Sequence, residues 1–254
     1  MSSNIWTADA LASNAISLKR RCWRVVEAQS KISTMKLTDT LAQQEALERI
    51  IEDTKTAVPE ECRHLGFLLF TPFRYTPYPF HSRFRRSGSL DGVFYAAEAT
   101  ETAIAEAAFY RLLFYAESPD TPWPANPNEH TAFAADIATP LAIDLTRAPF
   151  AARRDAWTHP TDYASCLHLA DVARTAKIEA IRYESARDPQ RRANIALLTC
   201  RAFAASDAVD RQTWHFHLSR TGIRAACEFP KQTISFDQTT FAADPRISAM
   251  QWER

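Results

Sequence analysis

Apolar residues recur at helical spacing in three segments of the chain. Residues 39–55 read DTLAQQEALERIIEDTK, in which leucine and isoleucine return every three or four positions. Residues 100–115 form an alanine-rich segment that Thr100 is expected to cap, and residues 161–176 are amphipathic with the same period. These patterns predict three helices.

Short runs rich in β-branched and aromatic residues predict the strands. They lie at residues 22–29, 92–98, 132–145, 178–185, 195–203, 213–220 and 223–229. Gly222 separates the last two runs, so we expect a hairpin there. Residues 64–73 fit either a strand or a short helix. Prolines predict an extended loop over residues 74–84 and a surface loop over residues 118–131.

These elements do not alternate strictly as strand and helix, which indicates an α+β fold. A chain of 254 residues without internal repeats is expected to form a single domain, residues 1–254. Within it we expect an N-terminal arm over residues 1–21 and a helical insert over residues 39–60, both bounds being approximate. A C-terminal hairpin and tail should occupy roughly residues 206–254.

The balance of charged residues bears on whether the partner is a nucleic acid. Lys+Arg and Asp+Glu both number 30, so the formal net charge is zero, which argues against direct binding to nucleic acid. No stretch has the roughly 20 apolar residues of a membrane span. The first 23 residues also lack the apolar run of a signal peptide. We therefore expect a cytoplasmic protein without a membrane partner.

The positions of the cysteines and glycines argue against a metal site and against a glycine-rich nucleotide-binding loop. The five cysteines show no CxxC pair and no zinc spacing, so we expect reduced thiols and no metal. Only four glycines occur, and they form neither a dinucleotide-binding fingerprint nor a phosphate loop. A nucleotide ligand would have to be held without a glycine-rich loop.

Five residues are candidates for chemistry, although each also has an ordinary structural explanation. Glu106 interrupts the apolar run AIAEAAF, where it is either a solvated helix glutamate or a carboxylate aimed into a cleft. Arg83 follows a proline-rich loop and offers the donor fork that suits phosphates. Arg24 stands in an apolar strand and needs an anion or a carboxylate. Tyr95 fits a strand core, and Ser185 fits a strand end.

The order and spacing of these residues are more specific than any one of them. The blocks WRVVEAQ, PFRY, SRFRRSG, GVFYAAEATETAIAEAAFYR, DYASCLHLADVAR, IEAIRYESARDP and NIALL together resemble the RES-domain family over roughly residues 22–205. The chain resembles the longer branch, with a helical insert before the arginine loop. It departs from many members at residues 82–84, which read Ser-Arg-Phe in place of Gly-Arg-Trp. Ser185 is matched to the family serine, with Ser165 as its rival.

The resemblance implies a fold similar to ADP-ribosyltransferases and the consumption of NAD⁺ as a substrate. It also implies a toxin of a toxin–antitoxin pair, restrained by an Xre-like helix-turn-helix antitoxin. The residues it suggests are Glu106, Arg83 and Ser185 for catalysis, and Arg24, Tyr95 and Ser165 for NAD⁺ binding. If so, Arg83 and Glu106 should line one pocket with the diphosphate and ribose between them.

Two alternatives stay open at this point. The ADP-ribose acceptor is water or phosphate in one case and a specific cellular protein in the other, and the sequence does not choose between them. A non-catalytic interaction module on the same fold is the second alternative, because a fold does not guarantee an activity. In that case the helical insert and the proline-rich loop would be interaction surfaces.

Overall fold

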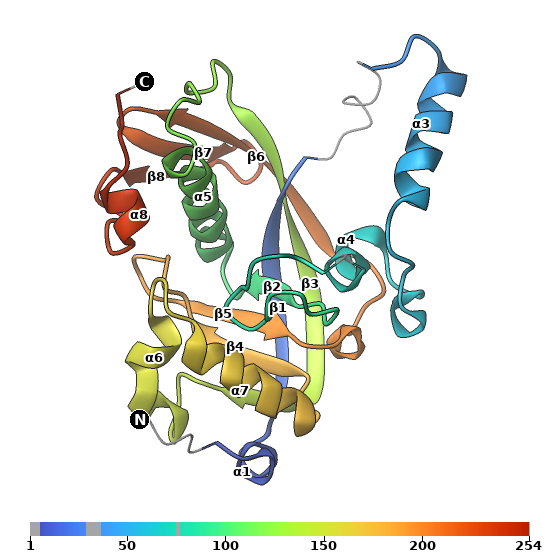
Figure 1. Cartoon of the computed structure of the whole chain (residues 1–254), viewed down its shortest axis with the longest axis vertical. Coiled ribbons are helices and arrows are strands. Elements are labelled where there is room, and N and C mark those ends of the chain that lie inside the picture. Colours follow the sequence, from blue (N-terminus) through green and yellow to red (C-terminus); the bar gives the residue numbers. More distant parts are fainter. Residues whose placement is uncertain (1–5, 29–36, 75–76, 254) are drawn as a thin grey trace.

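The computed structural model describes residues 6–28, 37–74 and 77–253. Within them, helices and strands are mixed around one large sheet, which confirms the α+β class (Figure 1). The strands are β1 (Ile16–Glu27), β2 (Phe94–Ala97), β3 (Asn128–Asp144), β4 (Ala180–Glu184), β5 (Ala193–Leu197), β6 (Asp210–Ser219), β7 (Gly222–Cys227) and β8 (Gln232–Asp237). The α-helices are α1 (Ala8–Ser13), α3 (Leu41–Asp53), α4 (Phe67–Phe70), α5 (Thr100–Ala116), α6 (Arg154–Thr158), α7 (Ala164–Thr175) and α8 (Pro245–Ser248). Short 3₁₀ turns are η1 (Glu60–Cys62), η2 (Thr71–Phe73), η3 (Phe150–Arg153) and η4 (Cys200–Ala202).

Part of the sheet closes on itself. Strand β1 pairs with both β2 and β3, so the order β1-β2-β5-β4-β3 returns to β1 as a ring of five strands. Strand β3 is long enough to pair with β6 along its first half and with β4, in parallel, at its end. Strands β6, β7 and β8 then continue the sheet outward as an antiparallel extension.

Three apolar clusters hold these layers together. One joins α5 to β6, β7, β8 and α8. A second is built from alternate residues of the five ring strands, together with η1 and α4, and includes Phe94, Phe133 and Ile195. The third packs α1, α6 and α7 against the other side of β4 and β5. Successive strand residues point to opposite faces, so neighbours such as Ile195 and Ala196 belong to different clusters.

Several predicted elements are confirmed by the structure. The insert helix α3 begins with a capping box at Thr40 and stands apart from the body of the molecule (Figure 1). Strands β6 and β7 form the expected hairpin, in which Ser219 pairs with Gly222. Gly222 has φ +130°, and a Cβ there would meet a backbone oxygen of Phe236, so the turn requires glycine. The open choice at residues 64–73 resolves to short helices.

Other boundaries were predicted wrongly. The basic end of the expected arm belongs to β1, because Arg21 pairs across strands with Asp136 and its charge is thereby accommodated. Residues 128–131 are the start of β3 and not part of a loop. Helix α5 has Ala99 at its N-cap without a side-chain bond, so Thr100 is not the cap. Gln29, at the end of the first predicted strand, lies outside the described residues.

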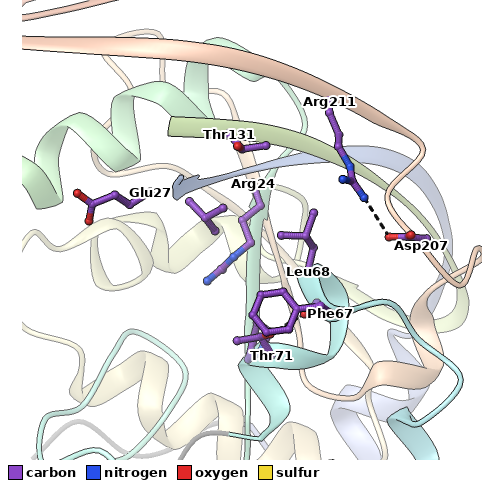
Figure 2. Close-up of a pocket in the computed structure, with 10 residues that line it drawn as sticks. Arg24, Glu27, Phe67, Leu68, Thr71, Thr131, Asp207 and Arg211 are labelled. Atoms are coloured by element: carbon purple, nitrogen blue, oxygen red, sulfur yellow. Dashed lines mark hydrogen bonds and ion pairs between the residues drawn. The ribbon is translucent and has the colours of Figure 1, made fainter. Parts of the chain in front are cut away.

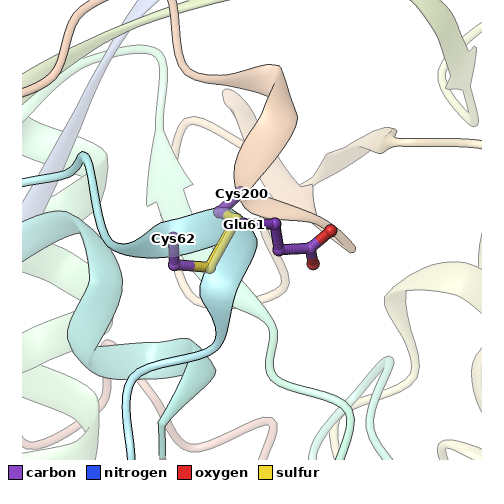
Figure 3. A group of neighbouring side chains, drawn as sticks. All are labelled: Glu61, Cys62 and Cys200. Atoms are coloured by element: carbon purple, nitrogen blue, oxygen red, sulfur yellow. A yellow bond between two sulfur atoms is a disulfide. The ribbon is translucent and has the colours of Figure 1, made fainter.

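The expectation of reduced thiols was also wrong for one pair of cysteines. Cys62 in η1 and Cys200 in η4 form a disulfide across 138 residues of sequence, with a Cα–Cα distance of 5.9 Å (Figure 3). Cys22, Cys166 and Cys227 are free and buried. The sulfur atoms of the bridge lie within 4.8 Å of the Glu61 carboxylate, but sulfurs bonded to each other do not supply the thiolates that a metal needs.

No helix among the described residues is long and apolar enough to cross a bilayer.

Candidate functional site

Glu106 lies at the centre of a hydrogen-bonded cluster. It projects half-buried from α5, the helix that follows β2. Its Oε1 atom accepts a hydrogen bond from Ser185 Oγ at 2.7 Å and another from Asn194 Nδ2 at 2.6 Å. Among the described residues, no side chain donates to Oε2. Glu106 is therefore not a solvated glutamate on a helix surface.

Ser185 is fixed from several sides. It is fully buried just beyond the end of β4, and its backbone N–H donates to the carbonyl of Arg192. Its Oγ accepts hydrogen bonds from the backbone N–H groups of Arg187 and Asp188. The rival serine, Ser165, is half-buried in the first turn of α7 and is not among the described donors to Glu106. The structure thus brings Ser185, and not Ser165, into a hydrogen bond with the glutamate.

Arg83 is buried in a fixed position rather than free in a basic loop. Its Nη1 donates to the carbonyl of Trp157 at 2.7 Å and its Nη2 to the carbonyl of His159 at 3.1 Å. Its guanidinium lies over the ring of Tyr163, 4.5 Å from the centroid. Burial alone would lower the pKa of Arg83, but ionisable neighbours, Glu106 among them, raise it overall. In the described structure the guanidinium of Arg83 donates to these backbone carbonyls and not to the Glu106 carboxylate.

Tyr95 shapes the arginine loop from β2. Its hydroxyl exchanges a hydrogen bond with Ser82 Oγ and accepts one from the backbone N–H of Phe84, each at 2.9 Å. These two residues flank Arg83, so one phenol fixes both sides of the arginine. Burial raises the pKa of Tyr95 above its ordinary value. Phe84, which stands where many family members have tryptophan, is fully buried against Tyr183.

Arg24 lies on the other face of the sheet. Its guanidinium stacks over Phe94, 5.3 Å from the ring centroid, whereas the side chain of Tyr95 points to the opposite face of the same strand. Arg24 also donates to the backbone carbonyl of Tyr95 at 2.8 Å. It lines a cavity of about 370 Å³ with residues of α4, η2, β3 and the segment before β6 (Figure 2). The structure therefore does not place Arg24 in the Glu106 cluster.

Two cavities on the described part of the molecule lie in other regions. The first is the Arg24 cavity, which is also lined by Phe67, Thr71 and Asp207. A second cavity, of about 390 Å³, is lined by charged residues of β4, of the segment between β4 and β5, and of the position directly after β2. Neither is lined by Arg83, Tyr95 or Glu106, so the shared pocket expected from the sequence is not one of these cavities.

Sequence reasoning missed three residues near Glu106. Asn194 was part of a family-like block but had no assigned role. The ring of Tyr163 stacks against the guanidinium of Arg83. Tyr110 follows Glu106 by one helical turn, and that i+4 spacing was the available signal. Tyr110 is 56% exposed, yet burial, Tyr163 and Glu106 raise its pKa above the ordinary value.

The arrangement has a clear chemical capacity. A carboxylate with one oxygen held by two donors and the other oxygen open can stabilise a developing positive charge. A buried arginine and accessible aromatic rings lie nearby. Together these groups suit a ligand that is anionic in one part, aromatic in another, and becomes cationic at the reacting atom.

Comparison with known proteins identifies the family. The family model described as "RES domain" matches residues 58–219. No curated protein matches the chain. Among solved structures, the crystal structure of the M. tuberculosis MbcT–MbcA toxin–antitoxin complex aligns over 95% of this chain and 97% of that one, with 9% identity and a TM-score of 0.45. The match spans Arg83, Tyr95, Glu106 and Ser185 but leaves out Arg24. The chain belongs to the RES-domain family.

Proposed function

We propose that this protein is an enzyme that cleaves the nicotinamide–ribose bond of NAD⁺. The observation that carries the proposal is the Glu106 carboxylate, held on one oxygen by Ser185 and Asn194 and left open on the other. We take NAD⁺ as the substrate because the chain belongs to the RES-domain family and the family resemblance implies NAD⁺ consumption.

The reaction requires a negative charge near the ribose, and Glu106 can supply it. The bond between the nicotinamide nitrogen and ribose C1′ breaks, and its electron pair leaves with the nitrogen, so nicotinamide departs as a neutral ring. Positive charge then develops on the ribose, and a fixed carboxylate stabilises it. A preorganised electrostatic group of this kind contributes about 2.7–4 kcal/mol in the transition state. An acceptor oxygen finally bonds to C1′, and its proton goes to solvent.

The surrounding residues fit the rest of NAD⁺. Arg83 is charged and held in place by two carbonyls, so we assign it to the diphosphate. Tyr110 offers an accessible aromatic face one turn from Glu106, which suits nicotinamide stacking. Tyr95, the candidate from sequence for that role, is assigned here to holding the arginine loop. We leave Arg24 out of this site because it faces another cavity.

The biological role in this proposal is that of a toxin with a cognate antitoxin. It rests on the family resemblance, whose members are usually toxins neutralised by an Xre-like helix-turn-helix protein. DNA contact would belong to that partner, since this chain has no net charge. Expression of the chain alone should then arrest growth, and co-expression of a neighbouring helix-turn-helix protein should restore it. Normal growth during sustained lone expression of the active enzyme would contradict this role.

The activity itself is tested with purified protein and NAD⁺, with and without phosphate and cell extract. We expect free nicotinamide, accompanied by ADP-ribose in buffer or by phosphorylated ADP-ribose when phosphate is present. Label that stays on a protein band from labelled NAD⁺ would instead favour protein ADP-ribosylation. Folded protein that releases no nicotinamide under any of these conditions would refute the proposal and favour a non-catalytic interaction module.

A further inference from the structure

Asn194 occupies a position where a polar side chain is costly. It lies in β5, with backbone pairing to β2 on one side and to β4 on the other, and it is 2% exposed. Its Nδ2 donates to Glu106 Oε1 at 2.6 Å. Its Oδ1 is buried without any hydrogen-bond partner in the described structure. A buried, unpaired acceptor costs about 1–3 kcal/mol of stability.

The orientation of this amide follows from the chemistry of its partner. An ionised carboxylate only accepts hydrogen bonds, so the NH₂ group of Asn194 must face Glu106. Turning the amide over would place two oxygens against each other. The unpaired Oδ1 is thus a direct consequence of using Nδ2 to hold the glutamate.

Asn194 and Ser185 hold the same oxygen from the same side. Ser185 follows β4 and Asn194 lies in β5, and these strands are paired neighbours. Glu106 comes from α5, so both donors tie a helix side chain to the sheet. Because they share Oε1, the carboxylate is fixed in rotation while Oε2 stays available for a substrate.

We propose that Asn194 is a positioning residue, which orients the Glu106 carboxylate toward the reacting ribose through one hydrogen bond. This inference rests on the proposed function of the site. It explains why a strand core keeps an amide whose oxygen has no partner, since an apolar residue would satisfy packing alone.

The test compares Asn194→Asp with Asn194→Ala in nicotinamide release from NAD⁺. Asparagine and aspartate have nearly the same shape, but aspartate lacks the amide donor, and a buried carboxyl this close to Glu106 either repels its charge or shares a proton with it, which lowers the negative charge at the site. At neutral pH we expect Asn194→Ala to lower kcat about 10–100-fold with KM changed less than about threefold, because a misplaced catalytic group mainly affects the transition state. Asn194→Asp should be slower still. A packing role would give the opposite order, with Asp close to wild type and Ala impaired, and would overturn the inference.

The matched control is Thr139→Val, which removes from β3 a buried hydroxyl that donates to Glu179. It should lower stability without changing kcat or KM. A second measurement separates this inference from the proposed function. In a double-mutant cycle of unfolding, Asn194→Ala and Glu106→Ala, each of which removes one partner of the hydrogen bond, should be non-additive whatever the activity. If wild-type protein releases no nicotinamide, the proposed function fails while the cycle still measures the contact, and additive effects would overturn the positioning role.

Discussion

At the scale of single residues, the serine hydroxyl has only one possible direction. Ser185 Oγ receives two backbone N–H groups, from Arg187 and Asp188, so its own proton points to Glu106. The same turn that ends β4 therefore orients a donor at the carboxylate. Hydrogen bonds from the backbone, and not from other side chains, therefore fix the direction of the serine proton.

Replacing Ser185 by alanine should lower kcat for nicotinamide release about tenfold or more, because Glu106 Oε1 loses one of its two donors. The matched control is Ser165→Ala, which should keep wild-type kinetics. Steady-state rates of the three proteins, each checked for an unchanged melting transition, provide the comparison. The serine assignment would have to be reversed if Ser165→Ala were the impaired variant.

The sequence pattern identified the charged residues of the site but not the residues that hydrogen-bond to them. Glu106 and Arg83 stand out because charges in apolar or proline-rich contexts are unusual. Asn194 does not stand out, since it lies 88 residues from Glu106 and single amides in strands have many explanations. Arg24 stood out for the same reason as Arg83, yet strand alternation places it on the other face.

At the scale of elements, the C-terminal segment holds the loop that carries Ser185. Arg187 lies over the ring of Phe109, and its Nη2 is 3.2 Å from the Asp244 carboxylate. Asp244 is fully buried and caps α8. Helix α8 lies beyond the residues matched by the family model, so an element outside that match supports the site.

Asp244→Asn should destabilise the fold by about 3–5 kcal/mol, because it leaves the buried Arg187 without its counter-charge. The control is Asp136→Asn, which breaks an exposed pair with Arg21 and should cost about 0–1 kcal/mol. Equilibrium urea unfolding measures both. Equal losses in the two variants would show that the Arg187 pair does not anchor the loop.

The same aspartate should make stability depend on pH. Burial alone would raise the pKa of Asp244, but hydrogen bonds from Arg246 and the charge of Arg187 hold it below the ordinary value of 3.8. A lowered folded-state pKa gives stability that is present above pH 3.8 and is lost as the pH falls below it. Wild-type protein should lose this contribution under acid and Asp244→Asn should not. Parallel pH profiles of the two would contradict the assignment.

Periodicity predicted α3, α5, α7 and the β6–β7 hairpin because each is a local pattern. It did not identify β8, although Ile234 and Phe236 alternate with polar residues over 232–237. It also divided β3 between a loop and a strand, because prolines before residue 128 hid where the strand begins. The closure of β1 onto both β2 and β3 depends on contacts distant in sequence, which no local pattern contains.

At the scale of the whole molecule, the closed ring of strands separates two environments. Its apolar cluster and the Arg24 cavity lie on one face of β2. The Glu106 cluster lies on the other face, between α5 and the β4–β5 pair. The disulfide between η1 and η4 joins the segment after α3 to the end of β5, beside the first of these environments. The candidate site is thus built from a rigid sheet, a helix and a loop anchored by the C-terminal segment.

The central claim is that Glu106 carries the charge that cleaves NAD⁺, and Glu106→Gln tests it most directly. Glutamine keeps the size of the side chain and removes only its negative charge. We expect the variant to melt near the wild-type temperature and to release nicotinamide at least about 100-fold more slowly, in line with the loss of about 2.7–4 kcal/mol of transition-state stabilisation. Nicotinamide release by Glu106→Gln at the wild-type rate would contradict the claim.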